Sequence, residues 1–302
     1  MEYDLIILGA GPAGLGCAVY AARYDLKIVV VGEIPGGMMT EAYLIDNYLG
    51  LPGLNGMEMS MKFIEHVRKF GVEIRAPEKI FSVVKSGAVF EVRTVSAVLK
   101  GKAILVALGM KKAGLNIPGE EEFRGKGVSY CATCDGILFS GMDVAIFGGE
   151  NIAVQSALML AGYCTKVHLL SDKKLSCDPE FLAKAMKAKN VEIREGVKIT
   201  QIYGREMAEG LKFEKAGKQY DIKVSGIFIE AGHMPSGELL RPLGVRMDAK
   251  GMVEVDGNMA TNVKGVFAAG DITNASGGFR QIITAVAGGA VASRSVLKYI
   301  RG

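Results

Sequence analysis

Long apolar runs alternate with glycine turns and helical stretches along the chain. The run DLIIL at residues 4–8 leads into the turn GAGPAG at 9–14, a helical pattern to about Arg23, and the run KIVVV at 27–31. Apolar residues follow one another in these runs without polar alternation, which is typical of strands buried on both faces of a parallel sheet. The N-terminal residues therefore predict a βαβ unit.

A second unit of the same pattern begins at Val144. It has the strand VAIF at 144–147, the turn GGEN at 148–151, a helix at 152–162 and the strand KVHLL at 166–170. Two such units predict an α/β protein with two Rossmann-like, three-layer nucleotide-binding domains.

Two further buried strands end in small residues, AILVALG at 103–109 and GVFAAGD at 265–271. Small residues at a strand end let a ligand approach the backbone closely. One segment precedes the second unit and the other follows it. We therefore expect residues 1–112 and 236–302 to form one discontinuous domain around one large ligand, with residues 113–235 inserted as the second domain.

Composition and charge exclude several classes of protein. The chain has 302 residues, of which 49% are hydrophobic and 23% charged, so it is long enough for two folded cores. The net charge of +4 is scattered rather than clustered, which argues against a nucleic-acid partner. No stretch reaches the roughly 18 apolar residues of a spanning helix, and no basic leader precedes the first strand. The expectation is a soluble, cytoplasmic protein without a membrane partner.

The turn GAGPAG matches the dinucleotide fingerprint through Gly9, Gly11 and Gly14. These glycines permit the tight turn, the approach of pyrophosphate to the backbone, and close packing of helix on strand. Glu33 follows the second strand, where an acidic residue accepts hydrogen bonds from a ribose. The alternative for Glu33 is a solvated strand end.

The segment SYCATCDG at 129–136 is the most specific chemical motif in the chain. Cys131 and Cys134 have the spacing of a redox dithiol, and Asp135 adds a carboxyl beside the second sulfur. Zinc would need two more ligands, and the sequence offers no second pair at ligand spacing. The other cysteines are expected to be small buried residues in a helix, a helix and a loop start: Cys17, Cys164 and Cys177.

Together these motifs resemble the low-molecular-weight thioredoxin reductases over essentially the whole chain. The resemblance rests on GAGPAG, the glycine pair at 36–37, DNYLGLPG at 46–53, CATCDG, GVFAAGD and the pair Arg280-Gln281. It implies a homodimeric FAD enzyme that reduces thioredoxin or a thioredoxin-like protein. In this family the inserted domain carries the dithiol and normally binds NADPH.

The resemblance also assigns roles to individual residues. For FAD it implies the pyrophosphate-binding residues Gly9, Gly11, Pro12, Ala13 and Gly14, the ribose ligand Glu33, and the further cofactor-binding residues Gly36, Gly37, Met38, Asn47, Ala107, Gly109, Gly270, Asp271, Arg280, Gln281 and Ile282. The alternative for Asn47 is that it only shapes its turn, and the alternative for Arg280 is that it only caps surface charge.

The dithiol roles follow the family pattern. Cys134 takes electrons from the flavin, Cys131 attacks the protein substrate, and Asp135 protonates the departing thiolate. Attack needs an accessible thiolate and flavin contact needs a sheltered one, so the two roles suit different positions in one ring.

The inserted unit departs from the family pattern. NADPH-using members have a third glycine where this chain has Glu150, and His-Arg-Arg where it has Ser171, Asp172 and Lys173. A carboxylate ~4 Å from pyrophosphate would repel it by about 4 kcal/mol. The favoured interpretation is that the Glu150 side chain caps the helix that follows, in place of phosphate.

These departures make NADPH a doubtful cofactor and favour an enzyme that takes its electrons from reduced F420 or ferredoxin. Asp172 leaves NADH open, because an acidic residue there can accept from a free ribose hydroxyl. Three alternatives also stay open: an NADH- or NADPH-dependent thioredoxin reductase, a ferredoxin or NAD(P) flavoprotein oxidoreductase with a vestigial dithiol, and a non-catalytic flavin redox sensor.

Overall fold

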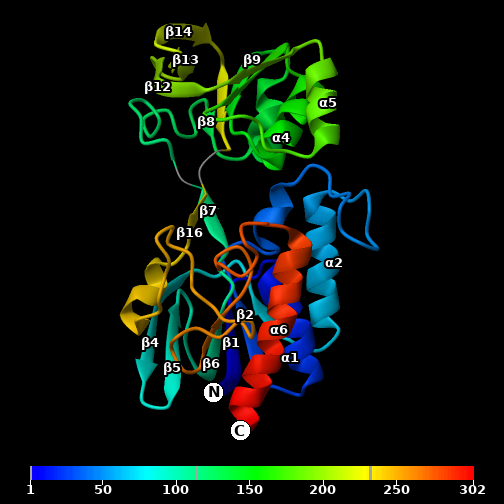
Figure 1. The fold of residues 1–302 in the computed structure, drawn as a ribbon, viewed down its shortest axis with the longest axis vertical. Coiled ribbons are helices and arrows are strands. Elements are labelled where there is room, and N and C mark those ends of the chain that lie inside the picture. Colours follow the sequence, from blue (N-terminus) through cyan, green and yellow to red (C-terminus); the bar gives the residue numbers. More distant parts are fainter. Residues whose placement is uncertain (1, 113, 231–232) are drawn as a thin grey trace. The chain divides into compact units, whose positions relative to one another are not determined.

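The structure is a computed structural model that describes residues 2–112, 114–230 and 233–302. The chain divides into two compact units, each described here by itself (Figure 1). The first unit comprises Met1–Thr40, Ile45–Lys111 and Met234–Gly302, and the inserted unit comprises Glu41–Leu44 and Lys112–His233. Ala113, the expected first residue of the inserted domain, lies outside the described residues.

The first unit is built on a seven-stranded sheet with the order β3-β2-β1-β6-β5-β4, in which β17 also pairs with β6. β1 pairs in parallel with both β2 and β6. The pairs β2–β3 and β6–β17 are also parallel. The pairs β4–β5 and β5–β6 are antiparallel. The strands are β1 (Glu2–Leu8), β2 (Ile28–Val31), β3 (Glu73–Arg75), β4 (Ile80–Ser86), β5 (Val89–Thr94), β6 (Val98–Val106) and β17 (Val266–Ala268).

Helices cover one face of this sheet, and the buried cluster on the other face combines residues of the sheet, among them β4 and β5, with residues of the C-terminal loops. The helices are α1 (Pro12–Arg23), α2 (Gly56–Arg68) and α6 (Ile282–Arg301) with the short turns η1 (Gly37–Glu41) and η3 (Glu238–Leu243). Successive residues of β1 alternate between the two cores: Leu5 and Ile7 pack with the helices, Ile6 and Leu8 with the opposite layer. A Cβ at Gly289 of α6 would lie 2.0 Å from the Ala13 carbonyl, so glycine lets α6 pack closely on α1.

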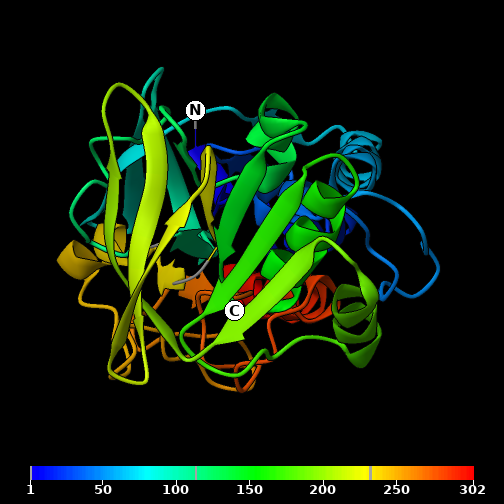
Figure 2. The ribbon, with the colours of Figure 1, turned by 90° about the horizontal axis from the view of Figure 1, so that it is seen from above.

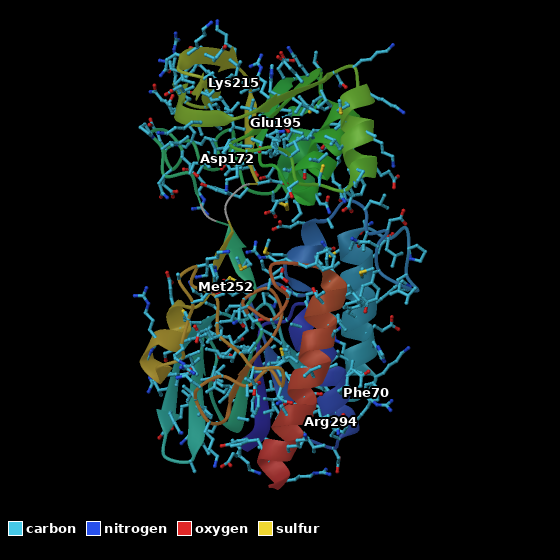
Figure 3. The ribbon with its side chains drawn as sticks, viewed as in Figure 1. Phe70, Asp172, Glu195, Lys215, Met252 and Arg294 are labelled. Carbon is cyan, nitrogen blue, oxygen red and sulfur yellow. A yellow bond between two sulfur atoms is a disulfide. The ribbon has the colours of Figure 1, made fainter. Side chains whose placement is uncertain are left out.

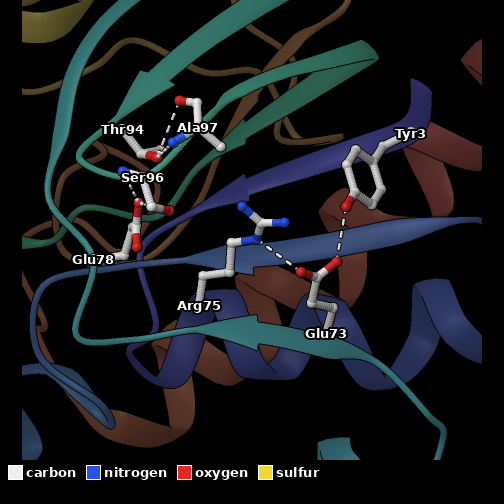
Figure 4. A network of polar contacts seen from close by, with 7 residues as sticks. All are labelled: Tyr3, Glu73, Arg75, Glu78, Thr94, Ser96 and Ala97. Atoms are coloured by element: carbon white, nitrogen blue, oxygen red, sulfur yellow. Dashed lines mark hydrogen bonds and ion pairs between the residues drawn. The ribbon is translucent and has the colours of Figure 1, made fainter. Parts of the chain in front are cut away.

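A polar network joins the strands at one edge of the first unit (Figure 4). The hydroxyl of Tyr3 on β1 donates a 2.8 Å hydrogen bond to Glu73 on β3, across the intervening β2. Arg75 Nε donates a 2.7 Å hydrogen bond to the other oxygen of Glu73. Both carboxylate oxygens are therefore satisfied, and the network fixes the short edge strand β3.

The inserted unit has a five-stranded sheet with the order β11-β10-β9-β15-β8, and every pairing in it is parallel. Its topological switch point lies between β9 and β15, where α/β sheets bind ligands beyond the strand ends. The elements are β8 (Val128–Ser129), α3 (Ala132–Asp135), η2 (Gly136–Phe139), β9 (Asp143–Phe147), α4 (Asn151–Ala161), β10 (Lys166–Ser171), α5 (Pro179–Lys187), β11 (Val191–Glu195) and β15 (Gly226–Ile229).

A three-stranded antiparallel sheet packs beside this sheet (Figure 2). It consists of β12 (Val197–Gly204), β13 (Ala208–Lys215) and β14 (Lys218–Lys223). A buried cluster that includes Leu170, Phe213 and Ile227 lies between the two sheets, and α4 and α5 cover the other face. A two-stranded pair, β7 (Met110–Lys112) with β16 (His233–Pro235), lies where the chain passes between the units.

The predicted fold class is confirmed, with both βαβ units at the expected residues. Cys17 lies buried in α1 as expected, but Cys164 follows α4 rather than lying within it, because that helix ends at Ala161. Burial raises the pKa of the thiols of Cys17, Cys164 and Cys177. None of the helices in the described ranges is both long and apolar enough to cross a membrane.

Candidate active site

The glycine turn of the first unit has no room for side chains. Gly9 has a φ of +118°, and a Cβ there would lie 2.1 Å from the carbonyl oxygen of Ala107. A Cβ on Gly14 would lie 2.0 Å from the carbonyl oxygen of Gly9. Both positions therefore require glycine, the first for its backbone angle and both for close packing of strand, turn and helix.

A second glycine turn lies against the first. The N–H of Gly36 donates a 2.9 Å hydrogen bond to the Ala10 carbonyl, and a Cβ on Gly37 would lie 2.8 Å from Gly11 Cα. Gly11 is the N-cap of α1 and supplies no side-chain hydrogen bond to the helix. The first N–H groups of this twelve-residue helix thus suit a phosphate.

The C-terminal segment forms a third side of this cradle. Gly270 has a φ of +81°, and a Cβ there would lie 2.8 Å from Ala13 Cβ. The amide of Asn47 donates a 3.0 Å hydrogen bond to Gln281, the N-cap residue of α6. Arg280 Nε is buried and has no hydrogen-bond partner among the described residues. A buried donor of this kind calls for a ligand atom.

These features fit FAD. The cradle brings the predicted residues Gly9, Gly11, Ala13, Gly37, Ala107 and Gly270 together, and the Asn47–Gln281 contact joins two more. The remaining predicted residues adjoin these along the chain: Pro12, Glu33, Gly36, Met38, Gly109, Asp271 and Ile282. Glu33 is exposed just after the end of β2. This position is compatible with binding a ribose and also with a solvated strand end.

The inserted unit contains the dithiol, which is closed as a disulfide between Cys131 and Cys134 with the Cα atoms 5.3 Å apart. Cys131 is the N-cap of the short helix α3. Ser129 Oγ accepts a 3.0 Å hydrogen bond from the Cys131 N–H and donates a 2.6 Å hydrogen bond to Asp135 Oδ2. The hydroxyl of Thr133 lies 3.3 Å from Cys131 Sγ.

The two cysteines differ in exposure. Cys134 is exposed and Cys131 is half-buried. Cys131 lies at the start of α3, where its N–H contacts Ser129. The assignment of Cys134 to the flavin and Cys131 to the substrate stays a prediction.

The glycine turn of the inserted unit ends at Glu150. Glu150 is the N-cap of α4, as predicted, but its side chain makes no capping hydrogen bond, so the prediction that its carboxylate caps the helix is wrong. Short side chains such as Ser, Asp and Asn suit that bond, whereas the longer glutamate points into solvent and is exposed. Its backbone instead bridges to Ser176.

The segment that begins at the end of β10 contains Ser171, Asp172 and Lys173, the residues predicted to depart from NADPH recognition. Ser171 is buried, and its hydroxyl accepts a 3.3 Å hydrogen bond from the Lys173 N–H. Asp172 follows, exposed (Figure 3). Glu195 accepts a 2.8 Å hydrogen bond from the Leu175 N–H, which holds the loop against β11. The segment 171–178 has no arginine for a 2′-phosphate.

Several residues that contact the dithiol were not predicted from the sequence. Ser129 and Thr133 lie within the motif SYCATCDG, and both contact Cys131. Glu230 is buried at the end of β15 and contacts the start of α3. In the sequence, the signal for Glu230 is a charged residue directly after the buried run IFI, because charged residues are seldom buried without a partner. Within the described part of the chain, no group of His, Cys, Asp and Glu could hold a metal ion.

Comparison with known proteins decides the family. The model of the pyridine nucleotide-disulphide oxidoreductases matches residues 3–289. The chain belongs to this family. Thioredoxin reductase of Bacillus subtilis is 35% identical over 310 residues, which cover 99% of this chain and 95% of that protein. One component of the alkyl hydroperoxide reductase of Escherichia coli is 36% identical over 306 residues, and the chain spans 58% of its length.

Solved structures of the family have the same fold. Thioredoxin reductase of T. acidophilum matches with a TM-score of 0.93 and 33% identity, covering 98% of each chain. A ferredoxin-flavin thioredoxin reductase of Clostridium acetobutylicum matches with a TM-score of 0.53 and 30% identity, covering 98% of this chain and 97% of that one. The chain is therefore a thioredoxin reductase-like member of a family of FAD-dependent disulfide oxidoreductases.

Proposed function

We propose that the Cys131–Cys134 pair accepts two electrons from bound FAD and passes them to a disulfide of thioredoxin or a thioredoxin-like protein. The observation that carries this proposal is the disulfide itself, closed beside a carboxyl that Ser129 holds in place. FAD held in the glycine cradle of the first unit would supply the two-electron chemistry. Membership of a family of disulfide oxidoreductases supports the same reaction.

The transfer to substrate is a thiol–disulfide exchange. A thiolate of the reduced pair attacks a substrate sulfur, the substrate S–S bond breaks, and a mixed disulfide forms. The second cysteine then attacks the enzyme sulfur of that mixed disulfide, which restores the Cys131–Cys134 bond and releases the substrate as a dithiol. Asp135, adjacent to Cys134, is suited to give a proton to the departing thiolate.

We further propose that the electron donor is not NADPH. The exposed carboxylate of Glu150 adds negative charge at the start of α4, where pyrophosphate would bind. The loop at 171–178 offers lysines but no planar, bidentate guanidinium for a 2′-phosphate. Reduced ferredoxin and reduced F420 are the candidate donors, and the likeness to a ferredoxin-flavin thioredoxin reductase supports the first.

NADH is the second candidate, because the exposed Asp172 directly after β10 has the chemistry to accept from a free ribose hydroxyl. We expect the working protein to be a homodimer in the cytoplasm, as the family resemblance implies.

An anaerobic donor screen tests the proposed function. The oxidised holoprotein is mixed with NADPH, NADH, reduced F420 or reduced ferredoxin, and the flavin absorbance is followed. Bleaching by ferredoxin or F420 at donor concentrations where NADPH is inert is the expected result. Fast bleaching by micromolar NADPH would refute the donor assignment.

A second measurement separates a working dithiol from a vestigial one. In Cys131→Ser, reduction of thioredoxin should vanish while the flavin still passes electrons to small acceptors. A variant that keeps its thioredoxin reductase activity would show that the pair is vestigial. A wild-type protein that is reduced once but never turns over would favour the redox sensor.

A further inference from the structure

A hydroxyl contacts the sulfur of the first cysteine of the pair. Thr133 Oγ1 lies 3.3 Å from Cys131 Sγ, and both residues are half-buried. The bond from Cys131 to Cys134 is closed in this structure, so Cys131 Sγ carries no hydrogen and can only accept. The Thr133 hydroxyl is therefore the donor in this contact.

Hydrogen bonds fix the backbone on both sides of Cys131. Its N–H donates a 3.0 Å hydrogen bond to Ser129 Oγ. Its carbonyl accepts hydrogen bonds from the N–H groups of Cys134, at 3.2 Å, and Asp135, at 3.1 Å. Thr133 lies in α3, two residues after Cys131. These backbone bonds involve neither sulfur, so the turn that presents the hydroxyl to Cys131 Sγ does not depend on the S–S bond.

A hydroxyl in this place favours a thiolate over a thiol. It can accept from an S–H group, but that hydrogen bond is weak because a thiol is a poor donor. Toward a thiolate the same hydroxyl donates to a full negative charge, and charge-assisted hydrogen bonds are roughly twice as strong as neutral ones. Because the bond to the charged form is the stronger one, the contact stabilises the Cys131 thiolate.

We propose that Thr133 is a catalytic residue, whose hydroxyl donates to Cys131 Sγ and makes Cys131 the thiolate of the reduced pair. Reduction adds two electrons and one proton to the S–S bond, which leaves Cys131 as a thiolate and Cys134 as a thiol. The thiolate then attacks a substrate sulfur, and the electron pair of the substrate S–S bond goes to the departing sulfur, which takes up a proton. This part in turnover rests on the proposed function.

Carboxyls and phenols pack around this turn. Asp135 lies on α3 itself, and Glu230, after β15, accepts a 3.2 Å hydrogen bond from the first N–H of α3. Tyr130 precedes the first cysteine, and the hydroxyl of Tyr163 lies against the glycine that ends α3. The elements α4 and η2 pack against α3 and carry no titratable side chain. Substitution of Thr133 leaves all of these groups in place, so its effect is separable from theirs.

The test is a pH profile of thiol alkylation. Holoprotein is reduced anaerobically with tris(2-carboxyethyl)phosphine, which becomes the phosphine oxide while water supplies the oxygen and the thiol protons. Iodoacetamide is then added between pH 5 and 10, and mass spectrometry follows the initial alkylation of Cys131 and Cys134 separately. In wild type, the midpoint for Cys131 should lie below the ordinary thiol value of about 8.5 and below the midpoint for Cys134.

Thr133→Val keeps the branched shape of the side chain and removes its hydroxyl. The midpoint for Cys131 should rise by about one unit, with little change at Cys134. Alkylation of Cys131 at pH 7 should slow by only about threefold, because an about tenfold loss of thiolate is partly offset by the greater nucleophilicity of a more basic sulfur. Thr133→Ser restores the hydroxyl, and its midpoint for Cys131 should return to the wild-type value.

Thr200→Val is the matched control. Thr200 lies on β12 of the same unit, where its hydroxyl donates a 3.2 Å hydrogen bond to the carbonyl of Lys212. This variant also exchanges a threonine hydroxyl for a methyl group, but it leaves the contact with Cys131 intact. Its profiles for Cys131 and Cys134 should both match wild type.

Superimposable Cys131 profiles for wild type and Thr133→Val would overturn the proposal. A Thr133→Ser profile that follows the valine variant would overturn it too, because the shift would then come from packing. If Thr133→Val does not fold, the wild-type profile still decides, since a midpoint for Cys131 at or above that for Cys134 contradicts a Cys131 thiolate. The expected shifts in a protein that does not reduce thioredoxin would support the role of Thr133 and refute the proposed function alone.

Discussion

The hydroxyl of Ser129 donates a 2.6 Å hydrogen bond to the carboxylate of Asp135. The same oxygen accepts a 3.0 Å hydrogen bond from the N–H of Cys131. One hydroxyl therefore links the peptide of the first cysteine to the carboxyl beside the second. This link fixes the orientation of Asp135 while the disulfide is closed, as proton transfer during exchange requires.

We expect Asp135→Asn to lower turnover with thioredoxin by about a hundredfold, because an amide cannot act as the acid. The asparagine oxygen still accepts from Ser129, so the melting temperature should change little. Steady-state reduction of thioredoxin measures the effect. Asp221→Asn, on β14 where the carboxylate accepts from Tyr203, is the control and should be active. Full activity in Asp135→Asn would remove that residue from the mechanism.

Gly9→Ala should abolish FAD retention and lower the free energy of unfolding by roughly 2 kcal/mol or more. The new Cβ would lie 2.1 Å from the Ala107 carbonyl, at a φ of +118° that alanine avoids. Flavin absorbance of the purified protein and urea unfolding report the two effects. Gly257→Ala is the control, because a Cβ there meets nothing within 4 Å. A yellow, stable Gly9→Ala protein would contradict the assigned cradle.

His168 makes the inserted unit sensitive to mild acid. Burial lowers the pKa of this histidine, Lys166 and Arg194 lower it further, and Glu192, with Oε2 3.3 Å from Nδ1, opposes the change. In the unfolded chain this histidine binds a proton as the pH falls through about 6.5, whereas in the folded protein it binds the proton only at lower pH. Stability is therefore complete above about pH 6.5 and is lost as the pH falls toward the lower folded pKa.

Melting temperatures at pH 7.5 and 5.5 test this dependence. His168→Gln should lose less stability between these values than wild type, whereas His66→Gln, at an exposed position on α2, should behave as wild type does. The carboxyl pKa values lowered by hydrogen bonds, as in Glu73 and Glu192, act only below about pH 4.5, outside this window. Equal losses in wild type and His168→Gln would contradict the account.

Glu150→Gly should improve the apparent affinity for NADPH by about tenfold at most. The exposed side chain already interacts with solvent, so its removal relieves only part of the full repulsion. Stopped-flow bleaching of the flavin at several NADPH concentrations gives the affinity. Glu206→Gln, an exposed site in the turn before β13, serves as control. An unchanged affinity would mean that Glu150 does not restrict the site.

The fold was predictable where pattern alone determines it. Continuous apolar runs and glycine turns predicted the positions of both βαβ units, because parallel strands that are buried on both faces consist almost entirely of apolar residues. The three-stranded sheet β12–β14 was not recognised as a separate layer. Its outer strand β14 is almost wholly exposed and polar, so its pairing with β13 follows from tertiary contacts rather than from its own composition.

The candidate site was predictable in part. The redox pair and the cradle glycines follow from chemistry that tolerates few other residues. The contact of Glu230 with Ala132 joins positions 98 residues apart, and no local pattern reveals it. The missing cap at Glu150 was not predicted for the same reason, because the direction of a side chain depends on neighbours that are distant in the sequence.

An anaerobic reductive titration tests the central claim most directly. Electrons are added stepwise to the oxidised holoprotein while the flavin absorbance and the free thiols of Cys131 and Cys134 are counted. Wild type should take up about four electrons per FAD, two in the flavin and two in the disulfide, and Cys131→Ser only about two. A wild-type protein that is saturated by about two electrons, with its disulfide still closed, would contradict a redox link between the flavin and the sulfur pair.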